Sequence, residues 1–174
     1  EYGTWDSRAV HPSTIIKDDG IYKMYYCGFA NQNGEWHIGL ATSNDGIHWT
    51  RVPHPVFYGG SASWESQISS ASVLIVNGTY YMFYTGRNYP NNKIGLATSP
   101  DGHNWTRYSG NPILQATENW EAYGVATPSV IYEDNMFKMV YMNSSAQITA
   151  FGMATSTDGI TWTKSSQNPI FTDE

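Results

Sequence analysis

Short apolar segments alternate with turns along the whole chain, and the same pattern returns about every 57 residues. In each period an apolar segment leads into a turn of Asp, Asn or Gly, and a second segment rich in aromatic residues follows. Short alternating segments bounded by such turns are typical of antiparallel strands. No stretch longer than a few residues repeats with the helical spacing of 3.6, so the pattern predicts an all-β protein.

Each period is predicted to hold four strands. The expected first strands are 12–17, 71–76 and 128–133. The expected second strands are 21–28, 80–86 and 137–143, and the expected third strands are 37–43, 93–99 and 150–156. A short fourth strand is expected to start at Trp49, Trp105 and Trp162. Tandem four-stranded antiparallel units are typical of a β-propeller, so we predict three blades, at about 5–61, 62–117 and 118–174.

Charge and composition narrow the possible partners. The net charge is −6, and the nine Lys and Arg residues are scattered singly. Nucleic acids and anionic membranes attract basic patches, so neither is an expected partner. The single cysteine, Cys27, lies in an apolar segment, which predicts a buried thiol and excludes an internal disulfide framework or a Cys-based zinc site. We expect no metal ion and no cofactor.

The segment "IGLATSPDGHNWTR" (94–107) returns as "IGLATSNDGIHWTR" (38–51) and as "FGMATSTDGITWTK" (151–164). A catalytic centre is rarely needed three times in one small chain. The Asp and Gly of this motif suit a hairpin turn in which the carboxylate caps backbone N–H groups. We therefore interpret Asp45, Asp101 and Asp158 as structural residues.

The repeated "PSV", "YTG", "IGLATS" and "NP" motifs resemble the five-bladed propeller superfamily of arabinanases, levansucrases and invertases (glycoside hydrolase families 43 and 32). The resemblance covers the whole chain and implies a carbohydrate ligand, glycoside hydrolysis and an extracellular or periplasmic location. It also implies a pair of carboxylates near the propeller axis, just before the first strands. At those positions this chain has His11, Ser70 and Thr127. A non-catalytic sugar-binding or scaffold propeller, or a fragment whose catalytic blades lie elsewhere, therefore remains open.

Three acidic residues are the candidates for acid–base catalysis. Asp6, Glu65 and Glu121 each follow a tryptophan shortly before a first strand, and we expect them to approach the axis. Because all three copies keep the acid, the alternative is a structural role in which each carboxylate fixes the entrance of its blade.

Departures from the repeat indicate candidate ligand-binding residues, because blade architecture does not require them. Arg8, Gln67 and Tyr123 are unlike residues in similar places, and His11 is a further departure that could also be a core histidine or a metal ligand. The loop before the third strand varies as well and contributes Trp36, His37, Arg87, Asn88 and Tyr89. Aromatic faces stack on sugar rings and polar groups bind hydroxyls. The predicted carbohydrate-binding residues are Arg8, His11, Gln67, Tyr123, Trp36 and Arg87.

Three blades do not close a ring, since propellers have at least about four. The spacing from Phe171 of one copy to Trp5 of the next would resemble the spacing from Phe57 to Trp64. We therefore expect two chains to form a six-bladed ring, head to tail. The alternative is that the chain is a piece of a longer protein.

Overall fold

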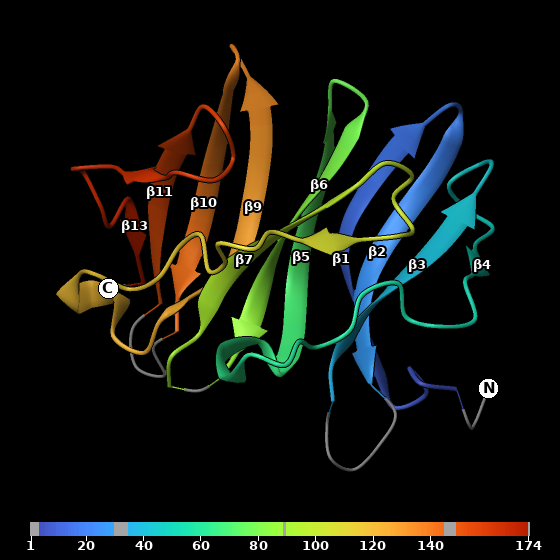
Figure 1. Cartoon of the computed structure of the whole chain (residues 1–174), viewed down its shortest axis with the longest axis horizontal. Helices are drawn as coiled ribbons and strands as arrows, with labels where there is room; N and C mark the ends of the chain where they lie inside the picture. Colours follow the sequence, from blue (N-terminus) through green and yellow to red (C-terminus); the bar gives the residue numbers. More distant parts are fainter. Residues whose placement is uncertain (1–3, 30–34, 89, 145–148, 174) are drawn as a thin grey trace.

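Three antiparallel sheets stand side by side, each built from one continuous segment (Figure 1); two have four strands and the third adds a short fifth. The computed structural model describes residues 4–29, 35–88, 90–144 and 149–173. The predicted all-β class and the three blades are confirmed. Within the described ranges, no helix is long and apolar enough to cross a bilayer.

The strands of each blade follow one another as a meander. Blade 1 holds β1 (Ala9–Asp18), β2 (Ile21–Phe29), β3 (His37–Ser43) and β4 (Thr50–Arg51). Blade 2 holds β5 (Gln67–Val76), β6 (Thr79–Arg87), β7 (Lys93–Ser99) and β8 (Thr106–Arg107). Blade 3 holds β9 (Val125–Glu133), β10 (Met136–Asn143), β11 (Ala150–Ser156), β12 (Thr163–Lys164) and the additional β13 (Phe171–Thr172). Two 3₁₀ turns, η1 (Ser63–Glu65) and η2 (Asn119–Glu121), precede β5 and β9.

The apolar core lies between blades. One cluster joins blades 1 and 2 and includes Tyr25, Ile38, Ile68 and Met82. A second cluster joins blades 2 and 3 and includes Phe83, Val125 and Met139. Each blade is thus stabilised by stacking on its neighbour, as expected for a repeat architecture.

Hydroxyl groups also join successive first strands. Thr14 Oγ1 accepts the N–H of Val73 at 3.2 Å, and the Ser72 hydroxyl accepts the N–H of Val130 at 3.0 Å. Thr14 and Ser72 hold equivalent places in blades 1 and 2. The next hydroxyl in this series is that of the exposed Ser129 on blade 3.

The pairing register of the first and second strands corrects our alignment of the repeats. His11 pairs with Cys27, Ser69 with Thr85 and Ala126 with Met142, and each partner lies three residues after a repeat methionine. His11 is therefore equivalent to Ser69 and Ala126, and the predicted equivalence with Ser70 and Thr127 is wrong by one residue.

A proline displaces the β-bulge of blade 1 by one residue relative to that of blade 2. Ser70 and Thr127 adopt positive φ angles of 45° and 53°, and Pro12 takes their place in blade 1. A proline ring holds φ near −65°, so it cannot adopt this conformation. The register of blade 1 consequently shifts at Ser13, between Pro12 and Thr14.

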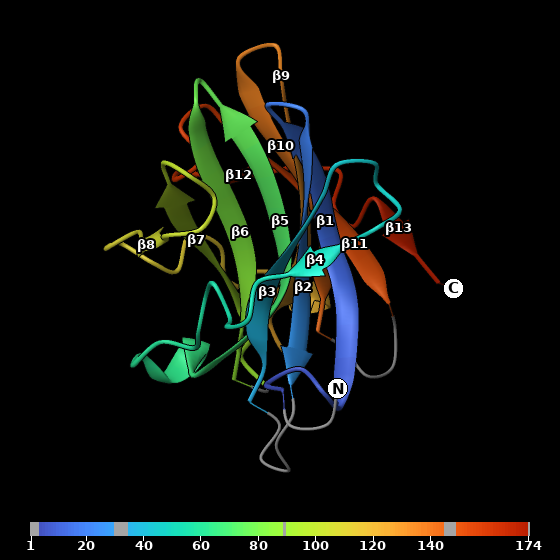
Figure 2. The ribbon, with the colours of Figure 1, turned by 90° about the vertical axis from the view of Figure 1, so that its right-hand side faces the viewer.

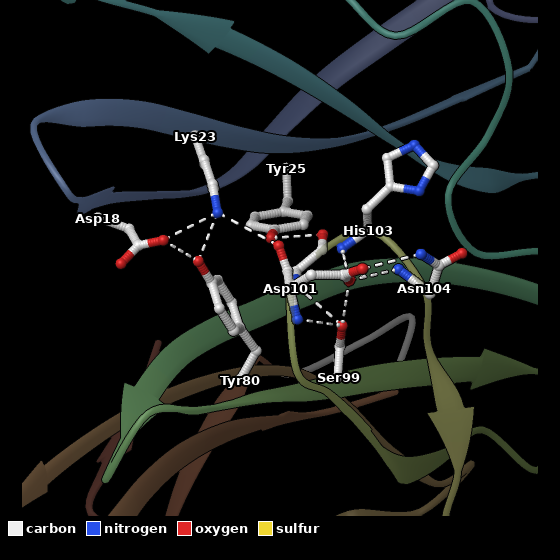
Figure 3. Close-up of polar contacts among 9 residues, drawn as sticks. Asp18, Lys23, Tyr25, Tyr80, Ser99, Asp101, His103 and Asn104 are labelled. Atoms are coloured by element: carbon white, nitrogen blue, oxygen red, sulfur yellow. Dashed lines mark hydrogen bonds and ion pairs between the residues drawn. The ribbon is translucent and has the colours of Figure 1, made fainter.

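The Asp–Gly turn of blade 2 is a capped hairpin, as predicted (Figure 3). Asp101 Oδ1 accepts the backbone N–H groups of His103 and Asn104, each at 2.8 Å. The Ser99 hydroxyl accepts the N–H of Gly102 at 2.9 Å. The same contacts recur around Asp45 and Asp158.

Blade 1 contacts this turn through two side chains of β2 (Figure 3). The Tyr25 hydroxyl donates to the carbonyl of Gly102 at 2.8 Å. Lys23 Nζ lies 2.9 Å from the Asp18 carboxylate, and the Tyr80 hydroxyl contacts both groups. Hydrogen bonds from Tyr80, and then from Lys23, hold the pKa of the Asp18 carboxyl below its usual range. The turn therefore caps its own hairpin and also joins two blades.

Within the described part of the chain, no sheet lies in front of the outer face of blade 1 (Figure 2). Ile15 on this face is 55% exposed, whereas its equivalent Val73 in blade 2 is 2% exposed. Gly46 in the Asp–Gly turn is exposed, whereas its equivalent Gly102 is buried against blade 1. On blade 3, at the other end of the row, Ile131 is 54% exposed. Both end faces thus expose apolar positions.

Candidate functional site at the entrance of the blades

A buried carboxylate stands at the entrance of every blade. Asp6, Glu65 and Glu121 are 4%, 6% and 0% exposed. Each accepts a hydrogen bond from a second-strand tyrosine: Tyr26 at 2.9 Å, Tyr84 at 2.6 Å and Tyr141 at 2.8 Å, respectively. Each also pairs with a fourth-strand cation: Arg51 at 3.1 Å, Arg107 at 3.0 Å and Lys164 at 2.6 Å. One carboxylate–tyrosine–cation arrangement therefore recurs three times.

These contacts turn the carboxylates toward the second and fourth strands of their own blades. The tyrosine and the cation thus hold each carboxylate on the sheet of its own blade, and the expected approach to the axis stays a prediction. A tryptophan covers each tyrosine; the Trp64 and Tyr84 rings, for example, stack with centroids 6.1 Å apart. A Cβ on Gly95 would lie 2.5 Å from the Tyr84 ring, which explains the glycine in the "IGLATS" motif.

Electrostatics at Glu121 favour a permanent anion. Burial raises the pKa of its carboxyl, but hydrogen bonds from Lys164, from two backbone N–H groups and from Tyr141 outweigh burial, and the net pKa is lowered. Burial, and then the bond to Glu121, raise the pKa of Tyr141. A general acid at neutral pH needs a raised carboxyl pKa. The surroundings of Glu121 thus favour a structural role, and the catalytic assignment of the three acids stays a prediction.

The first strands of the three blades surround a cavity of about 120 Å³. Its lining residues are His11, Pro12, Ser13, Cys27, Ser70, Ala71, Thr127 and Pro128. The structure thus gathers His11, Ser70 and Thr127 at the axis, and Cys27 is buried as expected. The described lining holds no Asp or Glu. Nor do three His, Cys, Asp or Glu side chains gather as a metal site anywhere in the described part of the chain.

Beside this cavity, at the junction of blades 1 and 2, lies a group of rings and cations that we call the Trp36 cluster: Arg8, His11, Phe29, Trp36 and Arg87. The Trp36 ring lies 5.4 Å from the His11 ring and 4.3 Å from the Phe29 ring. The Arg87 guanidinium lies 5.7 Å from the Trp36 ring centroid, and that of Arg8 lies 5.9 Å from Phe29. Trp36 is half-buried, whereas His11 and both arginines are exposed.

Four of the six predicted ligand-binding residues therefore belong to the Trp36 cluster. Gln67 is near it, because it pairs with Arg87 in the β5–β6 register. Tyr123 lies at the next junction, where its carbonyl accepts the N–H of Asn92 at 3.3 Å. Tyr89 lies outside the described residues.

Phe29, which contacts Trp36 directly, was not predicted from the sequence. The signal was present, because Phe29 and Arg87 end the second strands of blades 1 and 2 and differ in chemistry. They form the same kind of departure from the repeat that singled out the other cluster residues.

The architecture defines a β-propeller module. Residues 9–173 match the family described as "Glycosyl hydrolases family 32 N-terminal domain", and the chain belongs to this family. It is 34% identical over 134 residues to a "1,2-beta-oligomannan phosphorylase" of Thermoanaerobacter sp. (strain X514), covering 75% of this chain and 41% of the relative. A "Beta-1,2-mannobiose phosphorylase" of the same strain is 27% identical over 133 residues, covering 68% of this chain and 43% of the relative.

Solved structures share the fold at low sequence identity. A family 117 glycoside hydrolase of the marine bacterium Zobellia galactanivorans superposes with a TM-score of 0.82 at 18% identity, covering 99% of this chain and 60% of that one. Fructan 1-exohydrolase IIa from Cichorium intybus gives a TM-score of 0.78 at 21% identity, covering 92% and 32%. The chain thus spans about two fifths of these two phosphorylases, and part of a propeller.

Proposed function

We propose that this chain is the sugar-binding part of a carbohydrate-active propeller, and that it binds a saccharide at the Trp36 cluster. The observation that supports this most strongly is the gathering of His11, Trp36 and Arg87 from three strand ends, all at positions where the repeats differ. Aromatic faces suit the C–H face of a sugar ring, and Arg and His side chains suit its hydroxyls.

Family membership supports the ligand class. Two relatives are named for the phosphorolysis of β-1,2-linked mannosides, and the solved structures include glycoside hydrolases. Hydrolysis or phosphorolysis of a glycoside is the reaction class that these names bring to the proposal. Either needs an acid group at the glycosidic oxygen, and no carboxylate lines the described part of the axial cavity. We therefore propose that the chain supplies binding, and that Asp6, Glu65 and Glu121 support the blades.

The second candidate is a complete enzyme in which these three acids act as acid and base. A panel of plant and microbial glycans, assayed for binding, hydrolysis and phosphate-dependent cleavage, separates the two candidates. The proposal expects saturable binding of at least one glycan without turnover, unchanged in a Glu65→Gln variant that remains folded. Turnover by the wild type that is lost in folded Glu65→Gln would instead establish the enzyme, and binding of no glycan would contradict both.

We also propose that a second copy of the chain covers the exposed end faces. The Ser129 hydroxyl on blade 3 is equivalent to the hydroxyls of Thr14 and Ser72, which accept a backbone N–H group of the next blade. Ile15 on blade 1 is equivalent to the residues that donate those N–H groups. Two copies would supply six blades, one more than the five-bladed domain of the family. The competing occupant is a further blade of a longer chain.

A further inference from the structure

A larger cavity, of about 380 Å³, lies between blades 2 and 3. It opens at the end of the molecule that carries the Trp36 cluster, because both lie where a second strand ends and a third begins. Its walls carry a tryptophan, four amide side chains and one lysine. The lining residues are Ser63, Trp64, Asn88, Asn91, Asn92, Lys93, Gln115, Ala116 and Gly124.

The backbone around this cavity repeats that of the junction between blades 1 and 2. The carbonyl of Trp36 accepts the N–H of Ile68 at 3.3 Å, and the carbonyl of Asn92 accepts the N–H of Val125 at 3.0 Å. Trp36 and Asn92 each immediately precede a third strand, and Ile68 and Val125 each lie at the start of a first strand. The two junctions are therefore one frame with different side chains.

Those side chains decide whether the space is open. At the junction of blades 1 and 2, the His37 ring lies 6.3 Å from Trp5 and 5.1 Å from Tyr58, so three aromatic rings fill it. At the next junction Trp64 repeats Trp5, but Lys93 replaces His37 and Gln115 replaces Tyr58. Because Lys93 and Gln115 are more slender than the two rings they replace, the space between them stays open as the cavity.

The floor of the cavity is fixed by the backbone. Asn92 and Gly124 form a parallel bridge, in which Asn92 donates its N–H to the carbonyl of Tyr123 and accepts the N–H of Val125. Gly124 has a φ of +114°, and a Cβ there would lie 2.3 Å from the Asn92 carbonyl oxygen. The Asn92 side chain donates to Ser144 at 3.1 Å. A site with a fixed frame loses less conformational entropy on binding.

The remaining polar side chains of the cavity wall have no hydrogen-bond or ion-pair partner within the described residues. Within the described residues, no hydrogen bond or ion pair engages the side chains of Asn88, Asn91, Lys93 or Gln115. An amide presents a donor and an acceptor together, which matches two neighbouring hydroxyl groups. Trp64 adds an apolar wall, and the cavity volume falls within the usual range for ligand pockets.

We infer that this cavity is a second carbohydrate subsite, which binds an uncharged sugar unit through Trp64, Asn91, Lys93 and Gln115. One lysine among four amides matches a neutral polyol better than an anion, which favours clustered cations. The choice of a sugar among polyols rests on the proposed function. Arg87 lies over Trp36 and the next residue, Asn88, lines the cavity, so an oligosaccharide bound at both places would cross the end of β6.

The test uses ¹⁹F NMR of the protein labelled with 5-fluorotryptophan, with the signals assigned by single Trp→Phe substitutions. β-1,2-Mannobiose and 1-kestose are the titrants. We expect the Trp64 signal to shift saturably with at least one of them. Asn91→Ala should weaken that response about tenfold, and Gln167→Ala, a change at an exposed amide away from the cavity, should leave it unchanged.

A filled-cavity variant sharpens the test. Lys93→His combined with Gln115→Tyr rebuilds the aromatic set of the first junction, and should abolish the Trp64 response while the Trp36 response remains. A Trp64 signal that is silent with both sugars, or that still shifts in the filled variant, would overturn the inference. If Trp36 alone shifts, the proposed function stands without the second subsite. If Trp64 alone shifts, the cavity binds sugar and the proposed role of the Trp36 cluster is wrong.

Discussion

The backbone carbonyls of Trp36 and Asn92 make equivalent hydrogen bonds in successive blades. The Trp36 carbonyl accepts the N–H of Ile68 at 3.3 Å, and the Asn92 carbonyl accepts the N–H of Val125 at 3.0 Å, in each case from the first strand of the next blade. The side chains of these two residues differ completely in chemistry. The frame of the junction is thus set by repeated backbone contacts, and the ligand chemistry is set by residues that the repeat leaves free to vary.

Replacing Asp101 by Asn should cost stability and leave sugar binding unchanged. The carboxylate accepts two backbone N–H groups and holds the turn on which Tyr25 and Lys23 of blade 1 rest. Because the side chain is exposed, we expect a loss of about 1 kcal/mol in the free energy of unfolding, or about 3 °C in Tm. Asp19→Asn, in an exposed turn, is the matched control and should change neither. Weaker sugar binding by folded Asp101→Asn would contradict the structural role.

Replacing Glu121 by Gln should destabilise the protein much more. It leaves the half-buried Lys164 ammonium without its buried anion and weakens the bond from Tyr141. Breaking one half of a buried pair typically costs about 3 kcal/mol or more. Urea unfolding measures this loss, and Glu133→Gln, which removes a more exposed ion pair with Lys138, should cost much less.

The same carboxylate predicts an acid limit of stability. The pKa of Glu121 is lowered in the folded protein, so the unfolded chain binds its proton more readily. Its contribution is complete above the ordinary value of 4.5 and is lost as the pH falls through the lowered folded value. The acid-unfolding curves of the wild type and Glu121→Gln should therefore converge at low pH. A constant difference down to about pH 2 would contradict this assignment.

His37 predicts a second pH dependence, at higher pH. Its Nδ1 atom is buried without a hydrogen-bond partner in the described structure, and burial lowers the pKa of the ring, although Glu35 and the Trp36 backbone partly oppose this. The unfolded histidine therefore binds a proton more readily, so stability is complete above the ordinary value of 6.5 and falls below it. Urea midpoints between about pH 7.5 and pH 5.5 should drop less in His37→Phe than in the wild type. An unchanged drop in His37→Phe would show that other groups cause it; His54→Phe, at an exposed position, is the control.

The end faces predict a self-associating protein. We expect a mass in solution twice that of the 19.5 kDa chain, and expect Ile15→Lys together with Ile131→Lys to give monomers. Both side chains are more than half exposed in the single chain, so the changes should not disturb the core of a blade. A wild type that remains monomeric at high concentration would contradict the dimer and favour further blades of a longer chain.

The strands and blades could be predicted because the pattern of each strand occurs three times in the sequence. The expected third strands 37–43 and 93–99 coincide with β3 and β7. The one-residue error at His11 arose because the "PS" at 12–13 was aligned with the "PS" at 128–129, although the spacing from the repeat methionines already places His11 with Ser69 and Ala126.

The partners of the buried acids also recur in the sequence, as Tyr26, Tyr84 and Tyr141, and as Arg51, Arg107 and Lys164. Their contacts could not be predicted, because they join residues that are about 20 and about 45 positions apart and depend on how each blade folds back. The open cavity was hidden for the same reason. The aligned "HPVF" and "NPIL" segments make Tyr58 and Gln115 equivalent in the sequence. Only the bridges of Phe57 with Ile38 and of Leu114 with Ile94 show that these side chains lie beside the third strands.

The most direct test of the central claim is isothermal titration of the protein with β-1,2-mannobiose and 1-kestose, alongside its Trp36→Ala and Trp49→Ala variants. Trp49 is a half-buried tryptophan on the outer face of blade 1, away from the Trp36 cluster, and so is a matched control. We predict saturable binding of at least one sugar, weakened about tenfold or more in Trp36→Ala and unchanged in Trp49→Ala. Binding that is equal in all three proteins, or binding of neither sugar, would contradict a saccharide site at the Trp36 cluster.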